Sequence, residues 1–250
     1  WNLDDMSPRA GWPSLGQAVQ HPAKPTVLLI GDSTMASRTG YGTPLCRQLE
    51  PRVRCINLAR GGRSTLSFRQ EGLWDQALVE ARRYPGPVTL LIQFGHNDQP
   101  GKPGRSTDLA KEFPANLTRY LAEARAAGAQ PVLVTPLTRR SFKEERLDDH
   151  LAPWAAATRD VASRQSVPVI DLHRLRMQVV QNMGSVRADQ LATTPPGHAD
   201  FDRTRLRARG ACLFADLMSR ELSAQLPGLA LPRTQGQVCE QLAGQTPVMN

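Results

Sequence analysis

Three short polar motifs each come after a stretch that is typical of a strand, and the first carries a possible nucleophile. Gly-Asp-Ser at 31–33 comes directly after the run Val-Leu-Leu-Ile at 27–30. A serine hydroxyl just past a buried strand can attack a carbonyl, because glycine allows a sharp turn and a following helix offers free backbone N–H groups. The same residues also fit a simpler interpretation, in which Ser33 only caps that helix. Taken alone, the motif leaves both interpretations open.

The second and third motifs offer groups that can stabilise a negative charge. Gly-Gly-Arg-Ser at 61–64 comes after the predicted strand at 53–58, and Gly-His-Asn-Asp at 95–98 follows the apolar run at 88–94. Paired glycines let backbone N–H groups approach a ligand closely. In open parallel sheets the ligand crevice lies at the carboxyl ends of the strands. We therefore predict that the three motifs form one site.

The elements that must position these motifs alternate between strands and helices. The patterns predict strands near 27–30, 53–58, 88–94, 131–135 and 167–172, and helices near 43–50, 73–79, 114–127, 154–162 and 206–222. This order predicts an α/β fold, a three-layer α/β/α sandwich with a parallel sheet of about five strands in a flavodoxin-like arrangement. We expect residues 1–25 to form an irregular arm, 26–226 the domain, and 227–250 a tail tied back by a disulfide.

The composition of the chain excludes some classes of protein and favours others. The 250 residues suffice for one sizeable core, and no apolar run approaches the roughly 18 residues of a membrane span. The net charge of +8 comes mainly from arginine. Scattered arginines with few aromatic residues argue against nucleic acid, whereas an acidic polysaccharide fits through bidentate contacts to carboxylates. We expect no cofactor, no metal and a monomer.

The four cysteines bear on whether the protein is located in an oxidising or a reducing compartment. Cys46 and Cys55 lie near a predicted turn, and Cys212 and Cys239 fall in the last helix and the tail. Neither pair has the spacing of metal ligands, so two local disulfides are favoured among the three possible pairings. Two disulfides imply a periplasmic or secreted protein. The alternative is four free thiols in a cytoplasmic enzyme.

Four motifs in order resemble those of the GDSL/SGNH hydrolases, and most closely those of the rhamnogalacturonan acetylesterase branch. They are Gly-Asp-Ser-Thr-Met-Ala at 31–36, Asn-x-Ala-x-x-Gly-Arg-Ser at 57–64, Gln-Phe-Gly-His-Asn-Asp at 93–98 and Thr-Pro-Leu-Thr-Arg-Arg at 135–140. The resemblance extends from about 26 to 222. It implies a metal-free carbohydrate O-acetylesterase that acts on an acetylated polysaccharide or oligosaccharide, with pectic rhamnogalacturonan as a candidate.

The resemblance also implies roles for single residues. Ser33 is the nucleophile, and the developing oxyanion is held by the N–H groups of Ser33 and Gly62 and the amide of Asn97, as acyl transfer requires. Side chains expected to bind the substrate are Asp32, Arg63, His96, Arg139 and His198. For Arg63 and Arg139, ion pairs that shape the loops are the alternative role.

One position departs from the family pattern, which has Asp-x-x-His shortly before the last helix. Asp202 is in place, but Arg205 occupies the position of the expected histidine base. A guanidinium stays protonated and cannot take the serine proton, so we predict strongly impaired hydrolysis and an ion pair between Arg205 and Asp202. His198, in the loop before Asp202, is the alternative base, while His96 is expected to support its own loop.

Arg205 leaves a second function open, that of a non-catalytic polysaccharide-binding protein on the same fold. In that case the arginines that approach the crevice hold sugar carboxylates; they are Arg60, Arg63, Arg139, Arg140 and Arg205. Arg205 is either a natural change or a substitution introduced into an esterase. A lipid or thioester hydrolase is disfavoured, because no long apolar segment for an acyl chain is evident.

Overall fold

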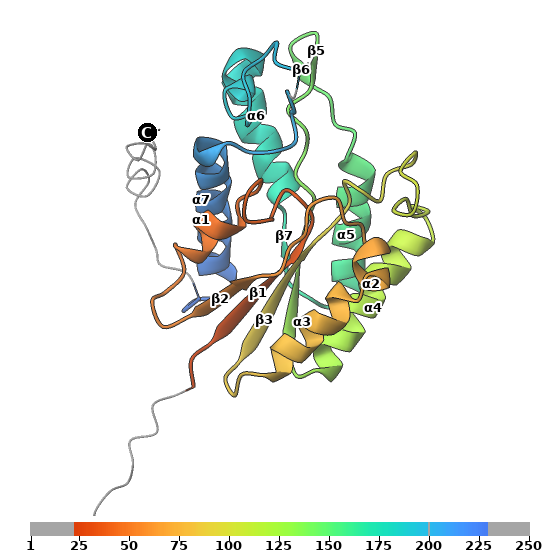
Figure 1. The fold of residues 1–250 in the computed structure, drawn as a ribbon, viewed down its shortest axis with the longest axis vertical. Helices are drawn as coiled ribbons and strands as arrows, with labels where there is room; N and C mark the ends of the chain where they lie inside the picture. Colours follow the sequence, from red (N-terminus) through yellow and green to blue (C-terminus); the bar gives the residue numbers. More distant parts are fainter. Residues whose placement is uncertain (1–22, 200, 230–250) are drawn as a thin grey trace, which may run out of the picture.

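A parallel sheet of five strands forms the centre of the structure, a computed structural model that describes residues 23–199 and 201–229 (Figure 1). Across the sheet the strands are β2 (Arg54–Asn57), β1 (Thr26–Gly31), β3 (Val88–Gln93), β4 (Gln130–Val134) and β7 (Val169–Ile170). Every neighbouring pair is parallel. Each strand overlaps a range predicted from the sequence, and the predicted α/β/α fold is confirmed.

Strand β1, which lies between β2 and β3, is buried on both faces, which explains its continuous apolar run. Successive side chains point to opposite sides of the sheet. Leu28 and Ile30 pack into one half of the core, whereas Val27 and Leu29 pack into the other. All four side chains have no exposed surface.

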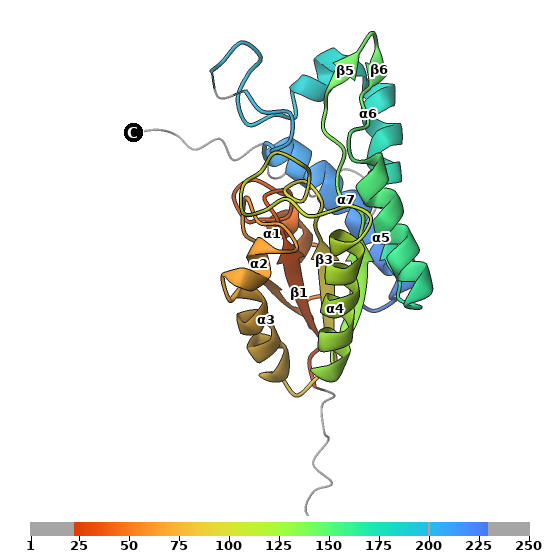
Figure 2. The same cartoon turned by 90° about the vertical axis from the view of Figure 1, so that its right-hand side faces the viewer.

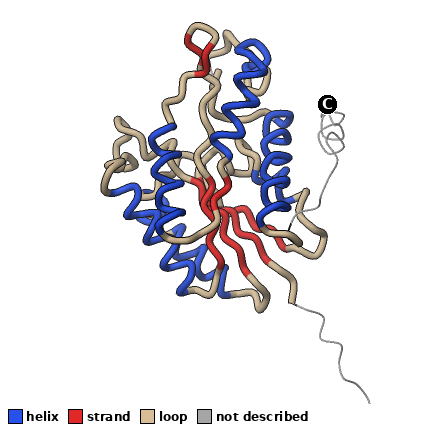
Figure 3. Tube along the Cα trace, turned by 180° about the vertical axis from the view of Figure 1, so that it is seen from behind, coloured by secondary structure: helices blue, strands red, loops and turns tan. Residues whose placement is uncertain are grey.

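Helices cover both faces of the sheet (Figures 2 and 3). The core on the side of Leu28 and Ile30 includes residues of α2 (Ser67–Gln70), α3 (Leu73–Arg82), α4 (Glu112–Ala126) and α5 (Ala152–Arg164). The opposite core includes residues of α1 (Gly42–Cys46), α6 (Leu172–Asp189) and α7 (Ala208–Gln225). The helices of the described residues are too short or too polar to cross a membrane.

Two elements were not predicted. A hairpin of β5 (Phe142–Lys143) and β6 (Arg146–Leu147) turns through Glu144 and Glu145, both with positive φ, where such turns usually use Asn-Gly. Helix α6 was missed because its core-facing side includes the buried Arg176 and because Gly184 interrupts its helical geometry. The helix predicted at 43–50 ends at Cys46.

A disulfide joins Cys46 at the end of α1 to Cys55 in β2, as predicted. The second predicted pair includes Cys239, which lies outside the described residues; its partner Cys212 is buried in α7. Most of the predicted arm at 1–25 and tail at 227–250 also lies outside the described residues.

Candidate active site

Ser33 lies at the carboxyl end of β1 in a turn rather than at the start of a helix. Gly31 ends the strand, and a Cβ there would lie 2.7 Å from the carbonyl oxygen of Gln93, so only glycine fits. Asp32 Oδ1 accepts hydrogen bonds from the backbone N–H and the hydroxyl of Thr34, both at 2.8 Å. Asp32 therefore caps the turn, and no helix follows until α1. The Ser33 hydroxyl itself makes no hydrogen bond to any described residue.

Beneath this turn, Asp32 and His96 form a buried pair. His96 Nδ1 lies 3.4 Å from Asp32 Oδ2, and the two side chains are 3% and 0% exposed. Burial lowers the pKa of His96, and attraction to Asp32 only partly offsets this effect. Its Nε2 has no hydrogen-bond partner in the described chain, so His96 does not contact the Ser33 hydroxyl. Both side chains are buried, and the role of Asp32 and His96 in binding substrate stays a prediction.

The second loop comes close to Ser33 through its glycines. A Cβ on Gly61 would lie only 3.7 Å from that of Ser33, and Gly62 has a φ of 80°, which favours glycine. The Arg63 guanidinium donates to Gly61 O at 2.7 Å and pairs with Glu71 at 2.7 Å. Arg63 therefore shapes this loop, which was the alternative role predicted for it.

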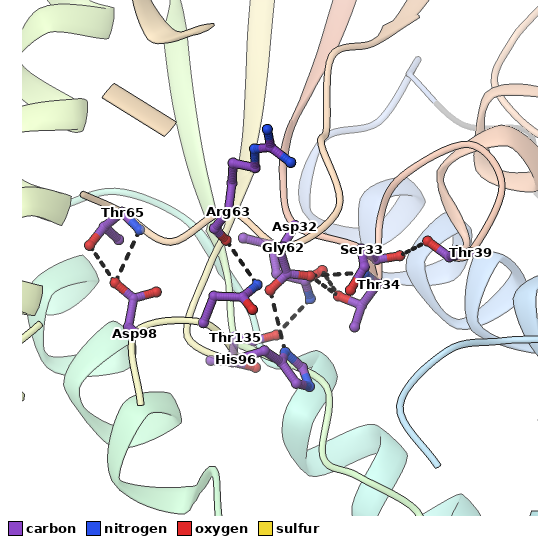
Figure 4. A network of polar contacts seen from close by, with 12 residues as sticks. Asp32, Ser33, Thr34, Thr39, Gly62, Arg63, Thr65, His96, Asp98 and Thr135 are labelled. Atoms are coloured by element: carbon purple, nitrogen blue, oxygen red, sulfur yellow. Dashed lines mark hydrogen bonds and ion pairs between the residues drawn. The ribbon is translucent and has the colours of Figure 1, made fainter. Parts of the chain in front are cut away.

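The third loop is joined to the second by Asn97 and Asp98 (Figure 4). Asn97 Nδ2 donates to Arg63 O at 3.1 Å. Asp98 Oδ1 accepts from the backbone N–H of Thr65 at 3.0 Å and from its hydroxyl at 2.5 Å. Burial raises the pKa of Asp98 to about 6, although the hydrogen bonds from Thr65 and Thr107 oppose the shift.

Each of the three loops has an N–H donor that makes no hydrogen bond within the described residues. In the described part of the chain, the backbone N–H groups of Ser33 and Gly62 donate no hydrogen bond. The Asn97 amide uses one of its two hydrogens on Arg63 O, which leaves the other. The three loops therefore offer the donors that an oxyanion needs.

The fourth loop places Arg205 against Asp202. Asp202 Oδ1 accepts the backbone N–H of Thr204 at 2.5 Å and that of Arg205 at 3.3 Å, while Oδ2 lies 3.5 Å from Arg205 Nε. Burial opposes the charged carboxylate, but these hydrogen bonds and the attraction to Arg205 outweigh it, so the pKa of Asp202 is lowered. The position of the expected base is occupied by a cation that is bound to its own loop.

Three other histidines lie in the described part of the chain. His198 is exposed in the loop before Asp202. His173 is buried with Nε2 2.7 Å from Asp149, and His150 pairs with Asp148 at 2.7 Å, so both have structural contacts. The predicted role of His198 as a substitute base stays a prediction.

Three cations near the crevice have no carboxylate partner among the described residues. Lys102 Nζ donates to His96 O, and Arg105 Nη1 donates to Gly62 O at 3.4 Å. Burial lowers the pKa of Lys102, and repulsion from Arg139 and Arg105 adds to this shift. Arg139 also lines a pocket of about 440 Å³ that includes Asp202 and Arg205.

Comparisons with known proteins identify the family and two relatives. The model of the GDSL-like lipase/acylhydrolase family matches residues 29–209. The rhamnogalacturonan acetylesterase RhgT of Bacillus subtilis is 35% identical over 208 residues, covering 77% of this chain and 87% of its own. The probable rhamnogalacturonan acetylesterase YesY of the same organism is 29% identical over 216 residues, covering 86% and 94%.

Solved structures share the fold. The protein YXIM of Bacillus subtilis superposes with a TM-score of 0.69 at 24% identity, covering 82% of this chain and 57% of that structure. The acetylxylan esterase Axe2 of Geobacillus stearothermophilus superposes with a TM-score of 0.60 at 18% identity, covering 80% and 95%. On the family match, the chain belongs to the GDSL-like lipase/acylhydrolase family.

Proposed function

We propose that this chain is a carbohydrate O-acetylesterase in which Ser33 is the nucleophile and Arg205 strongly reduces turnover. The observation that supports it most is the set of N–H donors on three strand-end loops: within the described residues the backbone N–H groups of Ser33 and Gly62 donate no hydrogen bond, and the Asn97 amide has one hydrogen besides the one donated to Arg63 O. Preorganised donors aimed at one oxygen stabilise the oxyanion of acyl transfer. The names of the curated relatives, both rhamnogalacturonan acetylesterases, support the same reaction.

In the proposed reaction the Ser33 oxygen attacks the carbonyl carbon of the acetyl group. The oxyanion forms at the three donors, and its collapse expels the sugar alkoxide, which takes up a proton. Water then attacks the acetyl-serine and releases acetate. Each step needs a group that accepts and returns a proton, and a guanidinium cannot do so at any working pH.

We propose an acidic, acetylated polysaccharide of the pectic type as the substrate. Lys102, Arg105 and Arg139 form a cationic group without carboxylate partners in the described chain, which suits sugar carboxylates. This group supports an acidic substrate over a neutral one. We further propose that the protein is exported, because the Cys46–Cys55 disulfide suits an oxidising compartment, and that it is a monomer.

The ion pair between Arg205 and Asp202 favours the second candidate, a polysaccharide-binding protein without turnover. Both candidates predict binding of acetylated acidic oligosaccharides, but only the esterase releases acetate. Calorimetric binding and acetate release should be measured on one preparation of the unaltered chain, with Ser33→Ala as the control. Binding without serine-dependent acetate release supports the binding protein.

The substrate class is tested in the Arg205→His background. We expect Arg139→Gln to raise KM for acetylated rhamnogalacturonan oligosaccharides about 10-fold, because a hydrogen-bonded charge is lost. KM for p-nitrophenyl acetate should stay the same. Arg146→Gln is the matched control, since Arg146 is exposed in the β5–β6 hairpin. An equal effect of Arg139→Gln on neutral acetylated xylan oligosaccharides contradicts the acidic substrate.

A further inference from the structure

Arg140 lies buried beneath the loop that carries Asp202, and its role was not evident from the sequence. It follows β4, and its side chain has no exposed surface. Nη2 donates to the carbonyl oxygens of Asp202 at 2.8 Å and Arg205 at 3.0 Å, and Nη1 donates to that of Thr204 at 3.5 Å. The backbone N–H of Arg140 donates to Arg203 O at 3.1 Å. One residue thus satisfies four consecutive carbonyls of the loop at 202–205.

A guanidinium suits this position for a physical reason. A loop without regular structure leaves buried carbonyls that need donors, and a planar fork of N–H groups can serve several at once. Burial lowers the pKa of Arg140 to about 10, with attraction to Asp202 and Asp189 opposing the shift. The side chain stays charged at neutral pH. With no exposed surface, Arg140 cannot hold a sugar carboxylate, which corrects its predicted place among the crevice arginines.

The same loop is also tied to the turn of the nucleophile. The backbone N–H of Leu206 donates to Thr39 O at 2.9 Å, and the Thr39 hydroxyl donates to Ser33 O at 2.6 Å. Thr39 therefore links the loop to Ser33 from one side, while Arg140 holds it from the other. The two anchors limit how far Asp202 and residue 205 can move relative to Ser33.

We propose that Arg140 is a positioning residue that fixes Asp202 and the side chain at 205 for the chemistry at Ser33. It acts through the loop backbone and contacts neither substrate nor the reacting atoms. Only the catalytic consequence of this role rests on the proposed esterase function. The effect of Arg140 on the order of the loop at 202–205 does not depend on that function, so loop order and catalysis can be tested separately.

The first test measures amide hydrogen exchange of peptides covering 201–207 in the full chain. The variants are Arg140→Met, which keeps side-chain length without donors, and Arg140→Lys, which keeps the charge and some donors. We expect Arg140→Met to speed exchange of the loop amides about 10-fold or more, with peptides of β1 and β3 unchanged. Arg140→Lys should give an intermediate increase. The matched control is Arg82→Met, because Arg82 is exposed at the end of α3, away from the loop. This variant should leave the exchange rates of the loop amides unchanged.

The second test measures kcat and KM for p-nitrophenyl acetate in the Arg205→His background. Misplaced catalytic groups lower kcat, so we expect Arg140→Met to reduce kcat about 100-fold with KM nearly unchanged, and Arg140→Lys to recover part of the loss. A variant that is merely less stable would lose active protein without this graded rescue by lysine.

Exchange within twofold of the unaltered chain in folded Arg140→Met overturns the proposal. Faster exchange spread evenly over the whole chain also overturns it, because it shows general destabilisation. If Arg140→Met does not fold, Arg140→Lys provides the test. Faster exchange of its loop amides supports the proposal, and exchange within twofold of the unaltered chain overturns it. If Arg205→His shows no serine-dependent activity, the proposed function fails, whereas the exchange measurement still decides the role of Arg140.

Discussion

Replacing Arg205 with histidine puts a proton acceptor at the position now held by a guanidinium. The backbone N–H of residue 205 already donates to Asp202 Oδ1 at 3.3 Å, and the side chain reaches toward Oδ2 at 3.5 Å. An imidazole on the same backbone can donate one N–H to this carboxylate, and we expect its other nitrogen to serve as the base for Ser33. Asp202 would hold the tautomer in which that nitrogen is free to accept a proton.

The size of the expected gain follows from the chemistry. Loss of the base from a serine triad costs about 10⁴- to 10⁶-fold in kcat, and the oxyanion donors retain part of the catalysis. We therefore expect Arg205→His to raise kcat about 1000-fold or more, which corresponds to about 4 kcal/mol of barrier. The ion pair that is lost is weak, since its side chains are 56% and 30% exposed. After screening by solvent it contributes at most about 1 kcal/mol to folding, so Tm should move by about 4 °C or less.

The assay is steady-state hydrolysis of p-nitrophenyl acetate by the unaltered chain, by Arg205→His, and by Arg205→His combined with Ser33→Ala. The combined variant should return to the level of the unaltered chain or below. High activity in the unaltered chain, equal to that of Arg205→His, would refute the reasoning, because another group must then serve as the base. A gain that survives Ser33→Ala would refute the assignment of the nucleophile.

Three further predictions concern the oxyanion donors, a buried carboxyl and the disulfide. In the Arg205→His background, Asn97→Ala should lower kcat about 100- to 1000-fold at nearly constant KM, and an effect on KM alone would argue against an oxyanion donor. Burial raises the pKa of Asp98 to about 6 in the folded chain. Above about pH 4 the unfolded chain has released this proton, whereas the folded chain still holds it. The titration of Asp98 should therefore lower the free energy of unfolding by up to about 3 kcal/mol as pH rises from 4 to 6. Urea unfolding of Asp98→Asn over the same pH range should lack this decrease. Parallel curves of unfolding free energy against pH for the two proteins would contradict the prediction. Replacing Cys46 and Cys55 with alanine removes a cross-link between residues 9 apart in sequence. It should destabilise the chain by about 2 to 3 kcal/mol in urea unfolding, and equal stability of the reduced and oxidised chain would contradict this.

The sequence allowed the sheet and the meeting of its loops to be predicted. Strands β1 and β3, which are buried on both faces, give continuous apolar runs, and glycine-containing polar motifs follow both of these strands and β2. Parallel strands deliver such motifs to one edge, which is where Gly61 approaches Ser33 and Asn97 binds Arg63 O. The pair Cys46 and Cys55 was also predicted, because a short separation across a turn suits a local disulfide.

Which polar side chains are buried was not predictable from the motifs. Asp32, His96 and Arg140 were all expected to face the crevice, yet all three lie beneath it. Their burial depends on partners distant in the sequence, such as the carbonyls at 202–205 that bind Arg140. A local pattern of residue types cannot predict such contacts.

Unrecognised elements have a similar cause. The core-facing side of α6 carries Arg176, whose guanidinium stacks over Phe214 at 4.4 Å, so the apolar stripe that would mark a helix is broken. The signal that was available is Asp171, which caps α6 by accepting from the backbone N–H of Arg174 at 3.3 Å. The hairpin turn at Glu144 and Glu145 lacks the residues that usually adopt positive φ.

The central claim is that Ser33 is a correctly placed nucleophile without a base, and covalent labelling tests it most directly. The unaltered chain, Arg205→His and Ser33→Ala would each be treated with an alkyl fluorophosphonate, and adducts followed by intact mass and peptide mapping. We predict a single adduct on Ser33 that forms about 1000-fold faster in Arg205→His than in the unaltered chain, and none in Ser33→Ala. Equal labelling rates with and without the histidine, or an adduct on another residue, would contradict the account.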